Sequence, residues 1–292
     1  MERNAILAIA AVIIIVVAAT GAYAVTRDDG SSDGEQSQID KALALIGTFA
    51  TGDTSVAEEL LADDYIQHNL AYGTGSASFI AAVQGLAAAP VGTTVQNVRA
   101  FEDGQYVFLQ NIYNFAGAGE QVAFDVFRFD DSGKIAEHWD NLAYVAEANP
   151  SGHTQTDGYT AIEDLDSTEA NRQTVTSFVY DILHGDDLSK LTSYFDGDSY
   201  IQHNTGIADG VSGLNAALAA MAEQGVSMVY EETYMVLAQG NFVLAVSEGY
   251  FAGEHVAFYD LFRVADGKIA EHWDIIETIP DQSEWANENG KF

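Results

Sequence analysis

The sequence contains the stretch Gly133-Lys134-Ile135-Ala136-Glu137-His138-Trp139-Asp140 twice, because residues 267–274 repeat it without a change. Upstream of each copy, Tyr65-Ile66-Gln67-His68-Asn69 recurs as residues 200–204. The copies lie about 135 residues apart, which is longer than a solenoid repeat of about 20–50 residues and matches a whole domain. The sequence therefore predicts a tandem duplication.

Both copies show the same succession of patterns. Apolar residues at helical spacing cover residues 41–61 and 172–195, and Ala-rich helices are predicted over residues 76–86 and 212–221. In the first copy, strands are then predicted over residues 95–101, 106–115, 121–129 and 134–143, with Asp103-Gly104 as a hairpin turn. Helices followed by a run of strands predict an α+β domain in which a curved antiparallel sheet wraps helices.

The repeat divides the chain into four predicted parts. Residues 1–27 are a membrane anchor or signal peptide, and residues 28–39 are a polar, acidic, flexible linker. The two copies occupy residues 40–160 and 161–292.

Composition excludes several classes of function. The 292 residues include 44 acidic and 11 basic side chains, a net charge of −33, and no cysteine. Disulfides, thiolate nucleophiles and Cys-ligated metal sites are excluded, and nucleic-acid binding is disfavoured because it needs clustered Lys and Arg. An acidic surface with only five Lys resembles the surfaces of halophilic archaeal proteins; the alternative is an ordinary acidic secreted protein.

An uncharged run near the N-terminus predicts that the chain is attached to a membrane. Residues 5–25 carry no charged side chain and match the roughly 20 residues that cross a bilayer. We expect a single-pass anchor with the C-terminal domains outside the cell. The alternative is a secreted protein whose signal peptide is cleaved after Ala22-Tyr23-Ala24, a small-x-small site.

Three motifs together resemble the SnoaL-like polyketide cyclase family, in particular its predicted aldol-condensation branch. They are Y-I-Q-H-N, D-x-F-R and G-K-I-x-E-H-W-D, and both copies carry them. The resemblance implies the cone-shaped fold of nuclear transport factor 2 for each copy, after the transmembrane helix. It also implies chemistry without a cofactor, carried by an Asp/His acid–base pair inside the cone, and no metal is predicted.

The motifs supply the candidate site residues. Burial in an apolar cavity raises a carboxyl pKa toward neutrality, which suits proton abstraction next to a carbonyl. We expect the two aspartates of the D-x-F-R motif to act as bases, with the H-W-D residues as acids or orienting partners. The predicted catalytic residues are Asp125, His138, Asp140, Asp260, His272 and Asp274, and the predicted ligand-binding residues are His68, Trp139, His203 and Trp273.

Strand alternation leaves the direction of these side chains open. His138 and Asp140 share one face of their strand, and Glu137 and Trp139 share the other. If the Trp139 face lines the cavity, His138 and Asp140 point outward and hold a contact between domains. The alternative for His68 and His203 is a hydrogen bond to backbone at a strand end.

The sequence is compatible with two functions. The first is an enzyme, an aldol-type cyclase or a related isomerase or hydratase, acting on a small apolar carbonyl compound. The second is a non-catalytic ligand-binding or assembly module at the cell surface. We expect no nucleic-acid partner. The duplication also allows the two copies to form a pseudo-dimer within one chain, with the convex faces of their sheets in contact.

Overall fold

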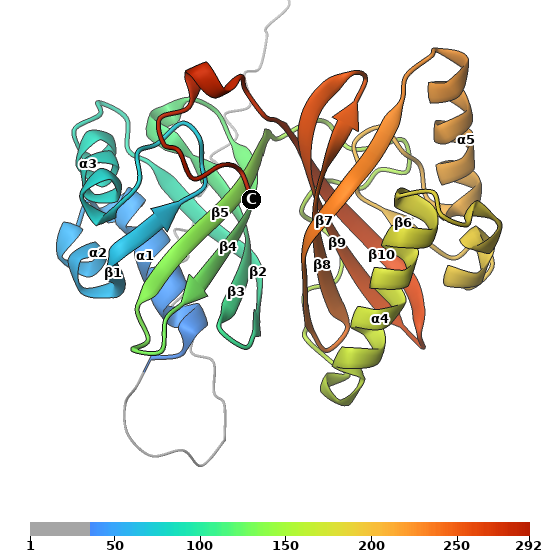
Figure 1. Ribbon diagram of the computed structural model, residues 1–292, viewed down its shortest axis with the longest axis horizontal. Coiled ribbons are helices and arrows are strands. Elements are labelled where there is room, and N and C mark those ends of the chain that lie inside the picture. The colour runs from blue at the N-terminus through green and yellow to red at the C-terminus, as the bar shows by residue number, and fades with distance from the viewer. Residues whose placement is uncertain (1–35) are drawn as a thin grey trace, which may run out of the picture. The chain divides into compact units, whose positions relative to one another are not determined.

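The computed structural model describes residues 36–292, so the predicted membrane segment at residues 5–25 lies outside the described part. Within residues 36–292, no helix combines the length and the apolar character needed to cross a membrane. Two domains follow each other in this part of the chain (Figure 1).

Domain 1 begins with helices and ends with strands. Its elements are α1 (Gln38–Thr51), α2 (Thr54–Leu60), β1 (Leu61–Gln67), α3 (Ser76–Ala87), β2 (Thr94–Asp103), β3 (Tyr106–Asn114), a 3-10 turn (Phe115–Gly117), β4 (Gln121–Phe129) and β5 (Ile135–Tyr144). Gly52 ends α1 in the left-handed conformation, φ 72°, which a residue without Cβ adopts at little cost.

Domain 2 repeats this order with a less regular first half. Its elements are a 3-10 turn (Leu165–Ser167), α4 (Thr168–Phe178), a π-helical turn (Val179–Leu183), a 3-10 helix (Leu188–Tyr194), β6 (Ile201–Gln202), α5 (Gly210–Glu223), β7 (Met228–Gln239), β8 (Phe242–Phe251), β9 (Glu254–Ala265), β10 (Lys268–Thr278) and a last 3-10 turn (Gln282–Glu284). The predicted helix over residues 172–195 is therefore a regular α-helix only to Phe178. Gly185, at φ 87°, separates the π-helical turn from the 3-10 helix.

Each domain has one five-stranded sheet, in the orders β1-β5-β4-β3-β2 and β6-β10-β9-β8-β7. The prediction of an α+β domain with helices against a sheet is confirmed, but the expectation of a wholly antiparallel sheet is wrong. β1 pairs with β5, and β6 with β10, in parallel. The helix after each of these short strands lets the chain return to the far edge of the sheet, which two-residue hairpins cannot do.

The two faces of each sheet have different partners. On the inner face of the domain 1 sheet, Leu109, Phe127 and Ile135 pack with residues of α1 and α3 in one buried cluster. On the outer face, Phe108, Phe124 and Trp139 share a second buried cluster with residues of β8, β9 and β10. Figure 1 shows the helices on the sides of the two sheets that face away from this shared cluster.

The segment that comes after each last strand crosses to the other domain. After β5, Asn149 Nδ2 donates to the carbonyls of Gln202 and Ile207 at 2.6 and 3.0 Å. After β10, Asn287 Nδ2 donates to the carbonyls of Asn69 and Tyr72 at 3.0 and 2.9 Å. The domains are thus tied both through their sheets and through exchanged segments.

Candidate active site

The strand pairing places one Asp/His/Asp cluster on the inner face of each sheet. Asp125 of β4 lies opposite Asp140 of β5 in the antiparallel register, and His138 lies two residues earlier on the same face. In domain 2, Asp260 of β9 lies opposite Asp274 of β10 in the same way. All six predicted catalytic residues therefore face the helices, and the alternative in which they point outward does not apply.

In domain 2 the cluster is held by a chain of hydrogen bonds. His272 Nε2 lies 3.0 Å from Asp260 Oδ1, and the hydroxyl of Tyr230 donates to Asp260 Oδ2 at 3.1 Å. Asn204 Nδ2 donates to Asp274 Oδ2 at 2.6 Å. Among the described residues, no side chain donates to the second oxygen of Asp274.

A glutamine fixes the tautomer of the histidine. Gln202 Nε2 donates to the hydroxyl of Tyr200 at 3.1 Å, so its Oε1 must accept, and it lies 3.0 Å from His272 Nδ1. The Nδ1 proton is therefore committed to Gln202. A further proton between His272 Nε2 and Asp260 can reside on either group, which gives the pair an exchangeable proton.

Burial and charge shift the pKa values of two members of the domain 2 cluster. Burial raises the pKa of the Asp274 carboxyl; His272 opposes this and the Asp260 charge adds to it, and the net shift is upward. Burial alone would lower the pKa of His272, but the hydrogen bond to Asp260 and the charges of Asp274 and Asp260 leave it raised. The site thus favours a proton on His272 and disfavours charge on Asp274.

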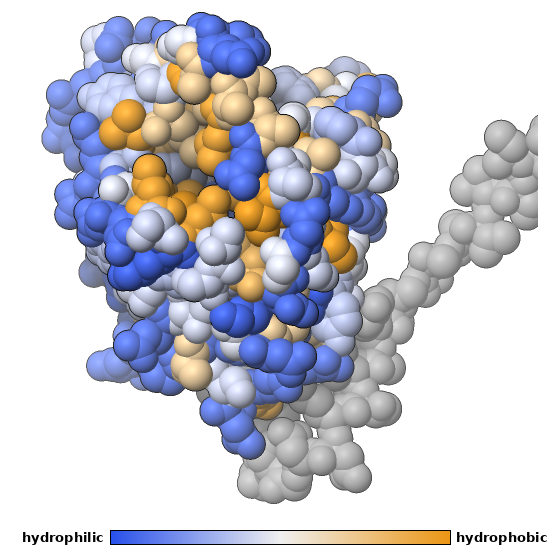
Figure 2. Space-filling view, turned by 90° about the vertical axis from the view of Figure 1, so that its right-hand side faces the viewer, coloured by the Kyte–Doolittle hydropathy of each residue, from blue (hydrophilic) through white to orange (hydrophobic). Residues whose placement is uncertain are grey.

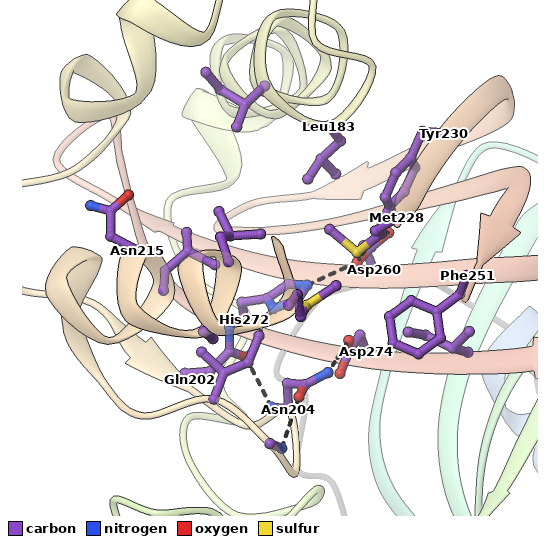
Figure 3. Close-up of a pocket in the computed structure, with 18 of the residues that line it drawn as sticks. Leu183, Gln202, Asn204, Asn215, Met228, Tyr230, Phe251, Asp260, His272 and Asp274 are labelled. Carbon is purple, nitrogen blue, oxygen red and sulfur yellow. Dashed lines mark hydrogen bonds and ion pairs between the residues drawn. The ribbon is translucent and has the colours of Figure 1, made fainter. Parts of the chain in front are cut away.

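This cluster lies at the wall of a cavity of about 770 Å³. Figure 3 shows His272 directed at Asp260, with Met228 and Phe251 beside the carboxylates and Leu183 across the space. On the surface, Figure 2 shows hydrophobic side chains gathered around a hollow. No Lys or Arg lines this cavity, whose lining includes Phe178, Ile182, Leu183, Leu214, Leu218, Met221, Met228, Tyr230, Phe251, Phe262 and Ile276. Such a lining suits an apolar, uncharged ligand.

The domain 1 cluster has the same core and one more donor. His138 Nε2 lies 3.1 Å from Asp125 Oδ1, and its Nδ1 lies 3.1 Å from Gln67 Oε1. Asn111 Nδ2 and the Tyr113 hydroxyl both donate to Asp125 Oδ2, at 2.7 and 3.0 Å. The second oxygen of Asp125 is therefore saturated.

Aromatic side chains fill the space above the domain 1 cluster. The Phe49 ring lies 5.1 Å from that of Phe79, 6.3 Å from Tyr113 and 5.8 Å from Phe115, measured between centroids. Domain 2 carries Leu214 at the position of Phe79, because each lies four residues after the glycine whose amide donates to the carbonyl of the Y-I-Q-H-N tyrosine. The strand registers place Gly249 at the position of Tyr113. The smaller side chains explain why the large cavity lies in domain 2.

The predicted ligand-binding residues lie elsewhere. His68 stacks on Trp139 and His203 stacks on Trp273, with ring centroids 4.8 and 4.6 Å apart, on the outer faces of the sheets. His203 and Trp273 do not line the domain 2 cavity. His68, Trp139, His203 and Trp273, which were predicted to bind a ligand, therefore lie on the opposite sheet faces from the Asp/His/Asp clusters, because strand alternation turns each Trp away from its neighbouring His and Asp.

The outer faces also hold the ion pairs of the repeated arginines. Arg128 Nε donates to Glu137 Oε2 at 2.7 Å, and Arg263 Nε donates to Glu271 Oε2 at 2.8 Å. Neither Arg bonds an Asp of the inner clusters. The repeated arginines therefore pair with glutamates on the outer faces and not with the aspartates of the inner clusters.

Three groups in the described part have the spacing to hold a metal ion. They are Asp125/His138/Asp140, Asp260/His272/Asp274 and His153/Asp157/His203, each with one ligand atom per residue within 4.8 Å of the others. In each group a His nitrogen already lies 2.8–3.1 Å from an Asp oxygen, so a metal ion would have to take the place of a proton between them.

Family comparison agrees with this architecture. A family model described as "SnoaL-like domain" matches residues 42–138 and again residues 175–272. The chain belongs to the SnoaL-like family. The tandem repeat of SnoaL-like domains predicted from the sequence is thereby confirmed. No curated protein gives a significant match.

Similar solved structures each span about one SnoaL-like domain of this chain. An NTF2-like protein of unknown function from Cytophaga hutchinsonii is 16% identical, with a TM-score of 0.34, over 38% of this chain and 95% of that one. TsrD from Streptomyces laurentii is 16% identical, with a TM-score of 0.33, over 38% and 91%. An LEH-like epoxide hydrolase from M. tuberculosis is 20% identical, with a TM-score of 0.31, over 35% and 76%.

Sequence reasoning missed several residues of the SnoaL-like site. Gln67 and Gln202 orient the histidines, and Asn69 and Asn204 bind the second aspartates. The repeated Y-I-Q-H-N motif contains all four, so their repetition was an available signal. Tyr230 gave no such signal, because its counterpart Tyr113 comes from a different strand.

Proposed function

We propose that domain 2 is a cofactor-independent acid–base catalyst acting on a small, apolar, uncharged carbonyl compound, in an aldol-type cyclisation or a related isomerisation. The observation that carries this proposal is the convergence of Asp260, His272 and Asp274 on one apolar cavity. A ligand in that cavity would be shielded from water, which strengthens electrostatic interactions with developing charge.

Asp274 is the proposed base. One of its oxygens is held by Asn204 while the other is open toward the cavity, and its raised pKa increases its affinity for a proton. Asp260, expected to be the base from sequence, has both oxygens engaged by His272 and Tyr230. In the proposed step, Asp274 takes a proton from the carbon next to the carbonyl. The proton shared by His272 Nε2 and Asp260 passes to the enolate oxygen, and the hydrogen bond between these two side chains breaks.

Deuterium exchange into an uncharged ketone tests this assignment. With 2-decalone in D₂O, we expect the protein to accelerate exchange at the α-carbons, followed by NMR. Asp274→Asn should reduce the accelerated rate by about 10²–10⁴-fold, the usual contribution of a general base.

Asp140→Asn is the matched control, because Asp140 is the equivalent residue under the filled cone of domain 1. Its exchange rate should equal that of the unaltered protein. A folded Asp274→Asn protein that exchanges at the full rate contradicts the assignment of the base. Binding of 2-decalone without any accelerated exchange would favour the ligand-binding alternative for domain 2.

For domain 1 we propose a supporting role. Its aromatic filling and the saturated Asp125 favour a scaffold over a second catalytic site. The scaffold supplies one side of the buried cluster between the sheets and the segment that reaches over domain 2.

The location remains a proposal from the sequence. The uncharged residues 5–25 support a membrane anchor with both domains outside the cell, and the acidic, Lys-poor composition supports a halophilic source. Deletion of residues 1–27 should release the protein from the membrane fraction. Release of the full-length chain at high salt would contradict the anchor.

A further inference from the structure

A second group of titratable side chains lies in domain 2 outside the cavity. It joins His153 and Asp157, from the segment after β5, to His203, which comes directly after β6. His203 Nδ1 lies 2.8 Å from Asp157 Oδ1, and His153 Nδ1 lies 3.5 Å from Asp157 Oδ2. One ligand atom from each residue lies within 4.8 Å of the others.

We propose that His153, Asp157 and His203 bind a divalent transition metal ion of the zinc type. Zn²⁺ takes imidazole nitrogen and carboxylate oxygen at about 2.0–2.2 Å, commonly with three protein ligands and one water. Tetrahedral ligands at that distance lie about 3.3–3.5 Å from one another. The donor atoms here span 2.8 to at most 4.8 Å, so small side-chain rotations would bring them to this spacing.

Both histidines are oriented in the way that metal ligands usually are. His203 Nε2 is held by Glu271 Oε1 at 2.9 Å, and His153 Nε2 is held by Asp209 Oδ2 at 3.2 Å. Each ring therefore gives its Nε2 to a separate carboxylate and turns its Nδ1 toward Asp157. A carboxylate behind a ligating imidazole fixes the tautomer and strengthens the ligand.

The Nδ1 atom of His203 faces two oxygen atoms in a buried setting. Its ring is completely buried, and Nδ1 lies 2.8 Å from both Asp157 Oδ1 and the carbonyl of Thr154. With a proton on Nε2 for Glu271, the Nδ1 lone pair would face two acceptor oxygens. Either a second proton or a metal ion removes that repulsion.

In domain 1, the equivalent histidine, His68, has fewer partners than His203. His68 Nε2 lies 2.8 Å from Glu137, and its Nδ1 lies 2.9 Å from the carbonyl of Gly290. On the Nδ1 side, the described residues bring no carboxylate and no second histidine to His68. The crossing segment of domain 1 is therefore held without a second histidine or a carboxylate at this point, whereas domain 2 carries both, and Asp157 Oδ1 there also accepts from the Thr154 amide at 3.0 Å.

The site is open to solvent on one side. The side chains of His153 and Asp157 are 31% and 44% exposed, whereas that of Glu271 is 2% exposed. A metal ion can enter without unfolding the buried half, and water can take the fourth position. The large negative charge of the chain also raises the local concentration of cations.

Calorimetric titration of the full-length chain with ZnCl₂ in 1 M NaCl tests the proposal, because this salt screens weak binding to surface carboxylates. We expect one saturable site per chain. His153→Ala and Asp157→Asn should each lower the affinity at least about 10-fold, since even indirect partners of a metal change affinity 10–100-fold. X-ray absorption should report two nitrogen ligands at about 2.0–2.1 Å.

His255→Ala is the matched control, because His255 pairs with Glu248 at 2.6 Å on an exposed surface without a second histidine. It should bind zinc as the unaltered chain does. A saturating concentration of zinc should raise the melting temperature by about 5 °C, and this shift should vanish in His153→Ala. Absence of a one-to-one site, or an affinity unchanged by His153→Ala, would overturn the proposal.

Discussion

At the scale of residues, the two Asp/His/Asp clusters differ in how many donors hold the first aspartate. Asp125 is bonded by His138, Asn111 and Tyr113, whereas Asp260 is bonded by His272 and Tyr230. The positions of Asn111 and Tyr113 are occupied in β8 by Ser247 and Gly249. Domain 2 has no ring at the position of Tyr113, which leaves room above its cluster. The Tyr230 hydroxyl, from the neighbouring strand β7, donates to Asp260 as the Tyr113 hydroxyl donates to Asp125.

The raised pKa values of Asp274 and His272 predict a bell-shaped pH profile for the exchange reaction. Activity needs Asp274 without its proton and His272 with one, so it rises with pH through the Asp274 pKa and falls through the His272 pKa. Because both values are raised, the acid limb should lie above the ordinary carboxyl range and the alkaline limb above the ordinary histidine value. Rates measured from about pH 4 to 9 check this; an acid limb near the ordinary carboxyl pKa of about 4 would contradict it.

The same shifts set the sign of a stability change. A raised His272 pKa stabilises the fold below the unfolded-state pKa, and this contribution is lost as pH rises through the folded value. A raised Asp274 pKa means that ionising Asp274 costs stability as pH rises from the ordinary carboxyl range through the folded value. Asp274→Asn should therefore flatten the fall of the unfolding free energy with pH, measured by urea unfolding.

At the scale of elements, the two cones differ in the helical wall that closes them. Domain 1 has two regular helices, α1 and α2, and its Phe49 and Phe79 meet inside the cone. In domain 2, α4 passes into a π-helical turn and then a 3-10 helix, where Leu188 is 64% exposed and lines the cavity. The shorter side chains and the looser wall together leave the cavity open.

This difference predicts that truncation to Ala lowers the unfolding free energy by unequal amounts at equivalent positions of α3 and α5. Phe79 is 6% exposed and surrounded by packed rings, so Phe79→Ala should lower the unfolding free energy by about 3–5 kcal/mol. Leu214 already lines an open cavity, so Leu214→Ala should cost less than about 2 kcal/mol. Urea unfolding of both variants checks the comparison, and equal costs would show that the domain 2 cavity is filled in solution.

At the scale of the whole molecule, residues 36–292 are joined by apolar packing and by exchanged segments. Phe124 and Trp139 share a buried cluster with Tyr259 and Trp273 of the other domain. Asn141 Nδ2 donates to the carbonyls of Ala257 and Ile275 at 2.9 and 3.0 Å. These contacts support the proposal that the two copies form a pseudo-dimer within the chain.

The net charge of −33 predicts that salt stabilises the folded chain. The screening length falls from about 10 Å at 0.1 M to about 3 Å at 1 M, which weakens repulsion between surface carboxylates in the compact state. The midpoint of unfolding by urea, an uncharged denaturant, should therefore rise between about 0.1 and 1 M NaCl. A midpoint that stays constant or falls would contradict a fold limited by its own charge.

Much of the site was predictable from the sequence because its determinants are local. The duplication, the order of helices and strands, and the shared face of His138 and Asp140 are set by exact repeats and strand alternation. Strand alternation also turns Arg128 to the face opposite Asp125, where it bonds Glu137.

Only the tertiary structure decided which domain is open and what each outer-face histidine meets. The cone of domain 1 is filled because four aromatic rings from α1, α3, β3 and the turn after β3 meet there, and no local pattern encodes that meeting. The partners of His203 come from the segment after β5 and from β10, far away in the chain. Local spacing determines which face of a strand a side chain takes; contacts between distant segments determine whether that face meets a packed core, a cavity or another domain.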